Sequence, residues 1–451
     1  MTPIDDLLDQ LQRDIPLYGH HTAAIGFKQA LVARLGVQQA HGPACAALQL
    51  PQMSRLRRLP VMALREAAQQ HGLHLRTLWP GGQSHELPRL QVVGERDDAP
   101  RTVIDRAGYL ACLDAVDVRG RSELLLWRDQ VLHDVEGDEA RRVRDQFIFD
   151  AQVLHAEADH WWVMDSAEPA PVIEEAFWLG GHHAHDFGHW LTEYLPKLAI
   201  ALRAGWPGGM PVLVDASAPA TVRQALTALL PPDTPLRPLA YLERLRVRRL
   251  WCAPNVSYPG FCPSLASNEE AARLLTAPTR MATLIEALGL RARQALDRPT
   301  GIERLYLARR PGRHKAIVNH EAVDAVLARH GFVRVLPEEH PFLEQLNLVR
   351  HARFIVAPEG SNALLGAFGG PGRQITVLTS PYTQPLLDLG ATATALEQSL
   401  TFFTGPCAQD SPRHTEHPFW RFWNDYRIDP AGLDSWLTGW LATGAAAGPA
   451  P

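Results

Sequence analysis

Two rhythms of apolar and polar residues divide the chain. In its first part, short apolar–polar runs separated by Gly, Asp and Arg at 111–120, 122–134 and 146–155 predict β-strands and hairpins. Further on, apolar runs of strand length alternate with segments of helical periodicity, beginning with a strand at 171–181 and a helix at 185–205. Strands that alternate with helices of ten or more residues predict βαβ units and a parallel sheet.

The alternation is most regular behind a Pro- and Gly-containing linker at 297–301. There the pattern predicts strands at 304–310, 332–337, 354–360 and 374–379, and helices at 319–331, 341–352 and 361–368. The predicted fold class is therefore α/β, with two Rossmann-like domains facing a cleft in a GT-B-like arrangement and an N-terminal helical/β extension. Open α/β sheets bind ligands beyond the carboxyl ends of their strands, so the cleft is the predicted ligand site.

Predicted domain boundaries follow these changes of pattern. Residues 1–95 form the N-terminal helical extension, in which 56–72 is predicted as one amphipathic helix that stops at Gly72. The four predicted units are the extension, a first Rossmann-like domain with a β-hairpin lead-in at 96–300, a second at 301–405, and a C-terminal closing helix and tail at 406–451. Within the first Rossmann-like domain, we expect 263–300 to be helical.

Composition narrows the class of protein. The 451 residues are 46% hydrophobic and 21% charged, as in soluble globular proteins, and the net charge of −5 makes nucleic acid an unexpected partner. Five scattered cysteines without C-x-x-C argue against a disulfide scaffold or a structural zinc site. The first residues lack an apolar signal segment and no run reaches about 18 apolar residues, so we expect a cytoplasmic protein with at most peripheral membrane contact.

The densest group of chemically active side chains lies where the predicted helix at 185–205 begins. A helix that starts near Asp186 places His189 and Glu193 four residues apart on one face. We predict a catalytic group in which Glu193 is the candidate base and His189 orients it or tunes its pKa. The same side chains would also suit the solvated face of a packed helix. A metal site of His185, His189 and Glu193 is a further alternative, which the missing H-E-x-x-H signature disfavours.

Two loops that follow predicted strands could bind an anion. Arg309, Arg310, Arg313 and Lys315 crowd the loop after the strand at 304–310, and Arg side chains bind phosphate oxygens bidentately. This loop therefore predicts a nucleotide-diphosphate site, with a solvated basic loop as the alternative.

The second loop follows the strand at 354–360, where Gly360 lets the backbone approach a ligand. Ser361 then begins a helix whose free N–H groups favour an anion. The chain lacks G-x-x-x-x-G-K-[ST], G-x-G-x-x-G and G-x-S-x-G, which argues against P-loop ATPases, classical NAD-binding proteins and α/β-hydrolases.

Taken in this order, the segments resemble glycosyltransferase family 61. The first motif of the family resembles N-x-x-H-x-x-x-D-x-x-P-x-L and here reads DFGHWLTEYLPKL, with Asp186 for the frequent Asn and Glu193 for the commoner Asp. Positions of the second motif are held by Arg309, Arg310, Arg313, Asn319, Gly331, Phe332, Glu344 and Gln345. The third motif, a strand leading into H-G-A or E-G-S, is matched by Glu359, Gly360 and Ser361.

The resemblance implies a GT-B fold and an inverting transfer from a nucleotide-diphosphate sugar to a glycan or lipid-linked acceptor, in surface polysaccharide biosynthesis. It implies that Glu193, His189 and Asp186 are catalytic. The implied donor site comprises Arg309, Arg310, Arg313, Asn319, Glu359, Gly360, Ser361 and Asn362. Residues 96–300 would hold the acceptor and 301–405 the donor, without a metal ion or organic cofactor. A noncatalytic nucleotide-sugar-binding protein of the same fold and a metal-dependent hydrolase are the rival functions.

Overall fold

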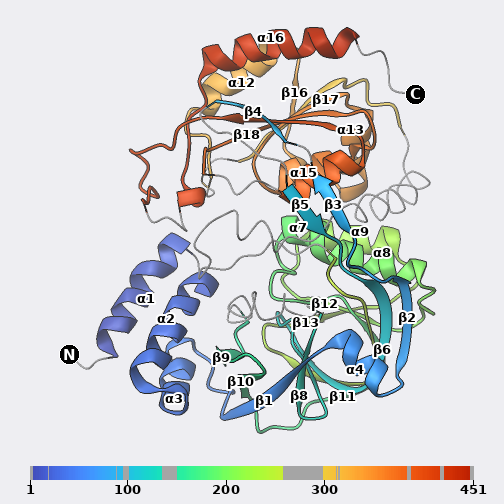
Figure 1. Ribbon diagram of the computed structural model, residues 1–451. Coiled ribbons are helices and arrows are strands. Elements are labelled where there is room, and N and C mark those ends of the chain that lie inside the picture. The colour runs from blue at the N-terminus through green and yellow to red at the C-terminus, as the bar shows by residue number, and fades with distance from the viewer. Residues whose placement is uncertain are drawn as a thin grey trace.

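The structure is a computed structural model, and it describes residues 4–18, 20–87, 89–94, 101–134, 150–256, 298–310, 312, 315–382, 387–416 and 421–446. Figure 1 shows a mixed α/β molecule with one sheet above another and helices packed against both. Three predictions fall partly or wholly outside the described residues. They concern the helix at 263–300 as far as residue 297, the residue Arg313, and the first four residues of the strand at 146–155.

The upper sheet has six strands and is parallel throughout, in the order β16-β15-β17-β18-β19-β4. Its strands are β15 (Arg304–Leu307), β16 (Val333–Val335), β17 (Phe354–Pro358), β18 (Gln374–Thr379), β19 (Ser399–Thr404) and β4 (Gln91–Val93). Their connecting helices are α12 (His320–Arg329), α13 (Phe342–His351), α14 (Ser361–Gly366) and α15 (Leu387–Ala395). The predicted strands and helices between 304 and 379 are confirmed. The strand order reverses between β15 and β17, which makes their carboxyl ends the topological switch point.

The lower sheet is mixed, in the order β13-β12-β11-β14-β6-β7-β8-β1-β10-β9, with β2 paired to β6. Four parallel strands are β11 (Val172–Trp178), β12 (Val212–Asp215), β13 (Leu236–Leu239) and β14 (Arg244–Cys252). The remaining strands are β6 (Gly108–Arg119), β7 (Leu125–Trp127), β8 (Gln130–His133), β1 (Arg55–Ala63), β10 (His160–Asp165), β9 (Val153–Ala156) and β2 (His74–Trp79). The switch point of this sheet lies between β11 and β14, with α9 (Ala220–Leu229) following β12.

The helix predicted at 56–72 is wrong over its first half. Residues 55–63 form β1, which pairs with β10 and with β8, and α4 (Leu64–Gln70) keeps the second half. Pro60 explains the error, because proline in a helix interior costs about 3 kcal/mol while strand partners are available on both sides of β1. Three helices precede this strand: α1 (Asp5–Tyr18), α2 (His20–Leu35) and α3 (Val37–Ala47).

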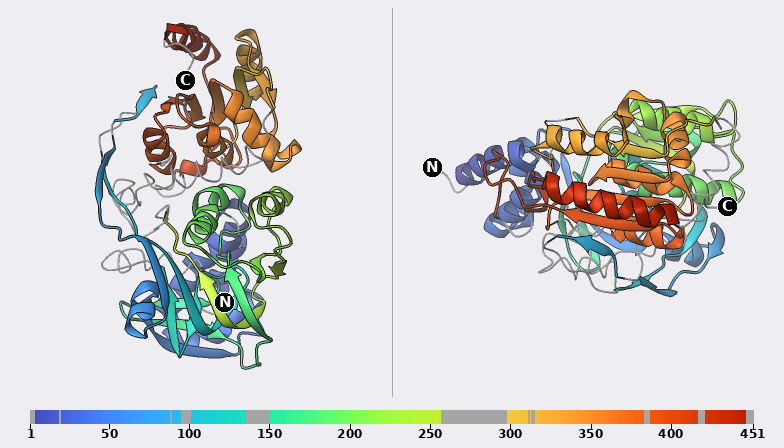
Figure 2. Two further views of the ribbon diagram at one scale, coloured as in Figure 1. Left: turned by 90° about the vertical axis from the view of Figure 1, so that its right-hand side faces the viewer. Right: turned by 90° about the horizontal axis from the view of Figure 1, so that it is seen from above.

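A ribbon of two antiparallel strands connects the two halves. β3 (Ser84–Leu87) leads up from the lower half and β5 (Arg101–Ile104) leads back, as Figures 1 and 2 show. Between them β4 forms the edge of the upper sheet, where Thr404 Oγ1 donates to Val93 O at 3.2 Å. Residues before 95 therefore belong to both halves of the molecule.

One apolar core also extends across both halves. Phe342 of α13 packs edge-on against Phe187 and Trp190, with ring centroids 6.3 and 5.9 Å apart. The halves are thus held against each other by buried apolar surface, which is the main favourable term in such packing. No helix in the described part of the chain combines the length and hydropathy needed to cross a bilayer.

The closing helix is α16 (Pro430–Ala446), which covers the upper sheet. Trp440 stacks on Phe332 with ring centroids 6.4 Å apart and meets Phe354 edge-on at 5.2 Å. Trp440 of the closing helix therefore packs against the core of the upper half.

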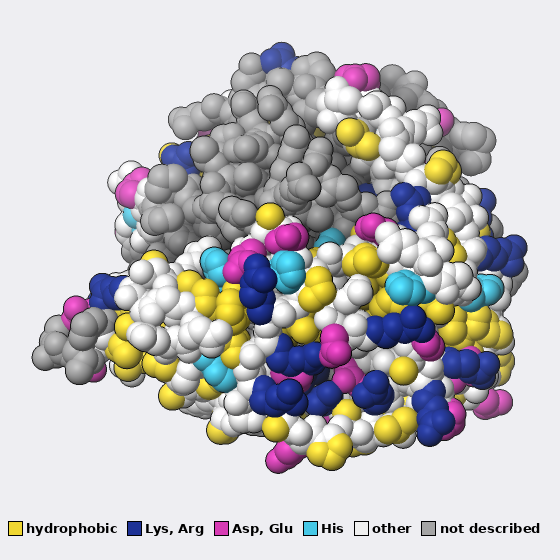
Figure 3. All heavy atoms as spheres, turned by 60° about the horizontal axis from the view of Figure 1, so that its bottom comes forward, with side chains coloured by type: hydrophobic (Ala, Val, Ile, Leu, Met, Phe, Trp, Pro, Cys, Tyr) yellow, Lys and Arg dark blue, Asp and Glu magenta, His cyan; other side chains and the backbone are white. Residues whose placement is uncertain are grey.

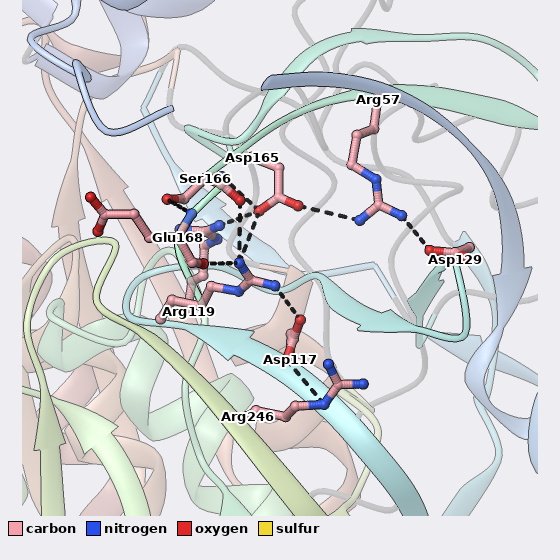
Figure 4. A network of polar contacts seen from close by, with 9 residues as sticks. Arg57, Asp117, Arg119, Asp129, Asp165, Ser166, Glu168 and Arg246 are labelled. Carbon is pink, nitrogen blue, oxygen red and sulfur yellow. Dashed lines mark hydrogen bonds and ion pairs between the residues drawn. The ribbon is translucent and has the colours of Figure 1, made fainter. Parts of the chain in front are cut away.

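A buried ion-pair network ties together the strands of the lower sheet (Figure 4). Asp165 on β10 pairs with Arg119 on β6, and its other oxygen accepts from Arg57 Nη1 on β1 at 3.2 Å. Although burial opposes it, the charges of Arg119 and Arg244 hold the pKa of Asp165 below its usual value. On the face seen in Figure 3, described Lys and Arg side chains lie among Asp and Glu side chains.

We expect Asp165→Asn to lower the free energy of unfolding by about 3–5 kcal/mol, because it leaves Arg119 buried without its charge partner. Asp129→Asn is the matched control, since Asp129 pairs with Arg57 at the exposed edge of the network. The depressed pKa means that the contribution of Asp165 is present at neutral pH and is lost as pH falls through its folded-state pKa. Urea unfolding at pH 7 measures both variants, and equal effects would contradict this assignment.

Lys28 on α2 gives the fold a second pH dependence. Its Nζ is buried and donates to Asp150 O at 3.0 Å and Val153 O at 2.8 Å, and burial lowers its pKa to about 7, with the charge of Asp150 opposing. Between pH 7 and 10.5 the unfolded chain binds a proton that the folded chain lacks, so stability rises with pH.

Between pH 7.5 and pH 9, we expect the free energy of unfolding of wild type to rise by about 1–2 kcal/mol relative to that of Lys28→Met. Unfolding curves of both proteins at each pH measure the difference. A constant difference across this range would show that Lys28 titrates alike in the folded and unfolded chain.

Candidate functional site

A cavity of about 290 Å³ lies between the two sheets, at the carboxyl ends of strands from both. The lower half contributes residues that follow β11 and β12: His185, Asp186, Phe187, Pro219 and Thr221. The upper half contributes residues that follow β15, β16 and β17, together with one from α13: Arg309, Pro337, Glu338, Gln345, Glu359, Ser361 and Asn362. The cavity therefore lies at the switch points of both sheets, where open α/β sheets bind their ligands.

The floor on the lower side is built by an interrupted helix. α7 (Phe187–His189) is capped by Asp186, whose Oδ1 accepts from Gly188 N at 2.7 Å and His189 N at 3.3 Å. A π-helical turn (Trp190–Tyr194) and α8 (Leu195–Arg203) follow, so the helix predicted at 185–205 is confirmed with an unpredicted turn inside it.

Pro196 explains the π-helical turn. It has no N–H to donate to the carbonyl four residues earlier, and the preceding Leu195 N–H donates instead to Trp190 O, five residues back. The wider turn keeps the backbone bonded and holds Glu193 inside the protein.

His189 and Glu193 form a hydrogen-bonded pair beside the cavity, which they do not line. His189 Nδ1 and Glu193 Oε1 are 2.5 Å apart. The Glu193 side chain is 1% exposed and that of His189 is 28% exposed. Burial raises the pKa of Glu193, while the charge of His189 opposes the shift. A ligand can therefore reach the imidazole more readily than the carboxylate, which supports the ring from inside.

Two further histidine rings pack beside this pair, one stacked on His189 and the next tilted against the first. The ring of His183 lies on that of His189 with centroids 4.0 Å apart, and the ring of His182 lies 3.8 Å from His183. Glu123 closes the other end, with its Oε1 3.3 Å from His182 Nδ1. Although burial opposes it, Glu123 raises the pKa of His182. The run of histidines in the sequence indicates part of this group. Glu123 lies in the loop between β6 and β7, some sixty residues earlier, and nothing around it in the sequence points to the site.

The i, i+4, i+8 spacing that suggested a metal site does not persist in the structure. His185 precedes the first helical residue, Phe187, so it does not share a helix face with His189 and Glu193. In the described ranges, no three His, Cys, Asp or Glu side chains are grouped so that they could hold a metal ion. His185 instead lines the cavity, and burial and the charge of Arg121 lower its pKa.

The arginines of the loop after β15 separate in space. Arg309 lines the cavity and donates from Nη1 to Glu359 O at 3.4 Å; the structure shows no ion pair for it within the described ranges. Arg310 points to the surface and pairs with Glu338 at 3.4 Å and Glu339 at 2.7 Å. Arg313 lies outside the described residues. Among the described arginines of this loop, Arg309 is therefore the one that lines the cavity and has no ion pair.

Glu359 lines the cavity with both carboxylate oxygens already bonded. Lys315 Nζ donates to its Oε1 at 2.6 Å and Thr379 Oγ1 to its Oε2 at 2.8 Å. Gly360 follows with φ of +119°, a conformation that strains any residue with a side chain. Arg309 Nη1 lies 3.8 Å from where a Cβ at Gly360 would stand.

Two predicted donor residues hold the upper half together. Asn362 lines the cavity and donates from Nδ2 to Ala308 O at 2.7 Å, which fixes α14 to the end of β15. Asn319 exchanges hydrogen bonds with the backbone of Ile428, at 2.7 and 3.1 Å. It neither caps α12 through its side chain nor lines the cavity. Ser361 lines the cavity at the start of α14. This helix has only six residues, so its dipole adds little to anion binding.

Comparison with known proteins identifies a segment that carries most of this site. A comparison with curated proteins returns no match. Residues 187–376 match the family model described as Glycosyltransferase 61. This stretch runs from α7 to β18 and includes the His189–Glu193 pair and every cavity residue of the upper half. The chain therefore contains a glycosyltransferase family 61 domain at residues 187–376.

Proposed function

We propose that this protein transfers a sugar, with inversion, from a nucleotide-diphosphate sugar to a hydroxyl of a glycan or lipid-linked acceptor. The observation that carries the proposal is the cavity at both switch points, with Arg309 on one side and the His189–Glu193 pair beside the other. The two α/β halves and this placement favour a GT-B arrangement, in which the upper half holds the donor and the lower half the acceptor.

The donor diphosphate would bind at Arg309. A guanidinium without an ion-pair partner in the described ranges can form charge-assisted bonds to phosphate oxygens without first breaking a salt bridge. Gly360 lets the ligand approach the backbone at the end of β17. Because α14 is short, we assign the leaving-group charge mainly to Arg309 and not to the helix dipole. The proposal requires no metal ion or organic cofactor.

The acceptor would be activated by His189. Glu193 engages Nδ1, so the acceptor hydroxyl would pass its proton to Nε2 as its oxygen attacks the anomeric carbon. The bond from that carbon to the diphosphate breaks, and the diphosphate leaves toward Arg309. Glu193 then stabilises the imidazolium that forms, as a buried carboxylate does for a catalytic histidine. The exposures of the two side chains thus favour His189 over Glu193 as the base.

A noncatalytic nucleotide-sugar-binding protein is the second candidate, since the cavity by itself requires only binding. The buried Glu193 beside a more exposed histidine favours an enzyme. We also propose a cytoplasmic location and a role in surface polysaccharide synthesis. The four described cysteines are free thiols, in line with a reducing compartment; the pathway rests on the resemblance to the family.

Arg309→Ala is expected to weaken nucleoside-diphosphate binding at least tenfold, about 1.4 kcal/mol, because it removes the cavity's guanidinium. Arg310→Ala is the matched control, as its side chain is paired at the surface, and should change affinity less than twofold. Thermal-shift screening of nucleotide sugars identifies the nucleotide. Calorimetry then measures its affinity for wild type and for each of the two variants. Equal effects in both variants would mean that the basic loop acts only through its overall charge.

His189→Ala is expected to lower kcat at least a hundredfold, the contribution of a general base, with donor affinity within twofold of wild type. Glu193→Gln should lower kcat by a smaller factor, since it keeps the imidazole but loses the charge that supports it. Donor hydrolysis serves as the assay if the acceptor is unknown.

His330→Ala provides the control, because His330 pairs with Asp434 away from the cavity and should leave kcat unchanged. A dead Glu193→Gln enzyme beside a nearly normal His189→Ala enzyme would assign the base to Glu193. Donor binding with no turnover in wild type would favour the noncatalytic protein.

A further inference from the structure

Gln345 on α13 lines the cavity although its side chain is almost fully buried. Its Nε2 donates to Pro337 O at 2.8 Å and to His340 O at 2.9 Å. Two carbonyl acceptors on one end of the amide identify that end as the nitrogen and fix the orientation of the group. The other end, Oε1, is buried and accepts no hydrogen bond from any residue that the structure describes.

An unpaired buried acceptor of this kind costs free energy unless it gains a hydrogen bond. Glu359, which the resemblance places in the donor site, already accepts one hydrogen bond at each carboxylate oxygen, from Lys315 and from Thr379. Asp186 uses Oδ1 to cap α7. The Gln345 carbonyl is therefore an acceptor in the lining of this cavity that the two bonds of Nε2 hold in place and that accepts no hydrogen bond from the described residues.

We propose that Gln345 Oε1 accepts a hydrogen bond from one O–H or N–H group of the bound nucleotide sugar and thereby selects the donor substrate. The inference rests on the proposed function and goes further by assigning a specificity residue. Because Nε2 is occupied, the site accepts and does not donate, so the recognised group must carry a hydrogen. Gln345 Nε2 donates to Pro337 O after β16, whereas Arg309 follows β15, so the recognised group would lie to one side of a diphosphate bound at Arg309.

Discrimination between ligands follows from this unpaired acceptor. A donor analogue without the recognised hydrogen would leave Oε1 unpaired, as it is before binding, and would lack the hydrogen bond that the parent gains there. We expect such an analogue to bind wild type at least tenfold more weakly, about 1.4 kcal/mol. Analogues altered at the other positions should lose less.

The experiment uses the nucleotide sugar that binds best and a series of its analogues, each lacking one hydroxyl or carrying a methyl group on one ring N–H. Affinities are measured for wild type, Gln345→Met and Glu344→Gln. Glu344 is the neighbouring control, since its exposed carboxylate contacts His340 3.4 Å away at the surface. One analogue should lose at least tenfold with wild type and with Glu344→Gln, and less than twofold with Gln345→Met.

Two results would overturn the inference while leaving the proposed function intact: a wild type that binds every analogue like the parent, or a Gln345→Met protein that discriminates as wild type does. Melting temperatures establish that the variants fold. If the methionine variant does not fold, Gln345→Leu replaces it in the same cycle, and the flat wild-type series remains decisive by itself. Failure of every nucleotide sugar to bind would instead overturn the proposed function, and this inference with it.

Discussion

The packing of Phe342 against Phe187 and Trp190 holds the two halves in register with each other. These rings join α13 of the upper half to the interrupted helix of the lower half, inside an apolar core shared by both. The carboxyl ends of β11 and β12 consequently face those of β15, β16 and β17 across one cavity. Neither sheet forms that cavity by itself, so the chemistry of the site depends on the contact between them.

The His189–Glu193 pair depends on a second constraint, the lack of an N–H at Pro196. The π-helical turn that results holds Glu193 inside the protein, where its Oε1 lies 2.5 Å from His189 Nδ1. Burial raises the pKa of Glu193, and a buried carboxylate that stays charged needs a partner, which His189 supplies. The same burial that makes Glu193 a good support makes it a poor direct acceptor of a substrate proton.

Sequence periodicity predicts the upper sheet well because each βα unit is local, and strands β15 to β18 lie where the apolar runs place them. It fails where pairing is distant: β1 was expected as helix, and β4 gives no sign that its partner is β19, some three hundred residues away.

The candidate site divides in the same way. The four-residue spacing predicts that His189 and Glu193 share a helix face. The ends of two predicted strands place Arg309 and Gly360 at the ligand site. The roles of three other residues follow only from three-dimensional contacts: Glu123 beside His182, Glu359 paired with Lys315, and Arg310 paired at the surface.

A crystal structure with a bound nucleoside diphosphate tests the central claim most directly. The account predicts phosphate oxygens within hydrogen-bond distance of Arg309, between the two sheets; a diphosphate in the separate cavity lined by Arg413 and Arg427 would contradict it.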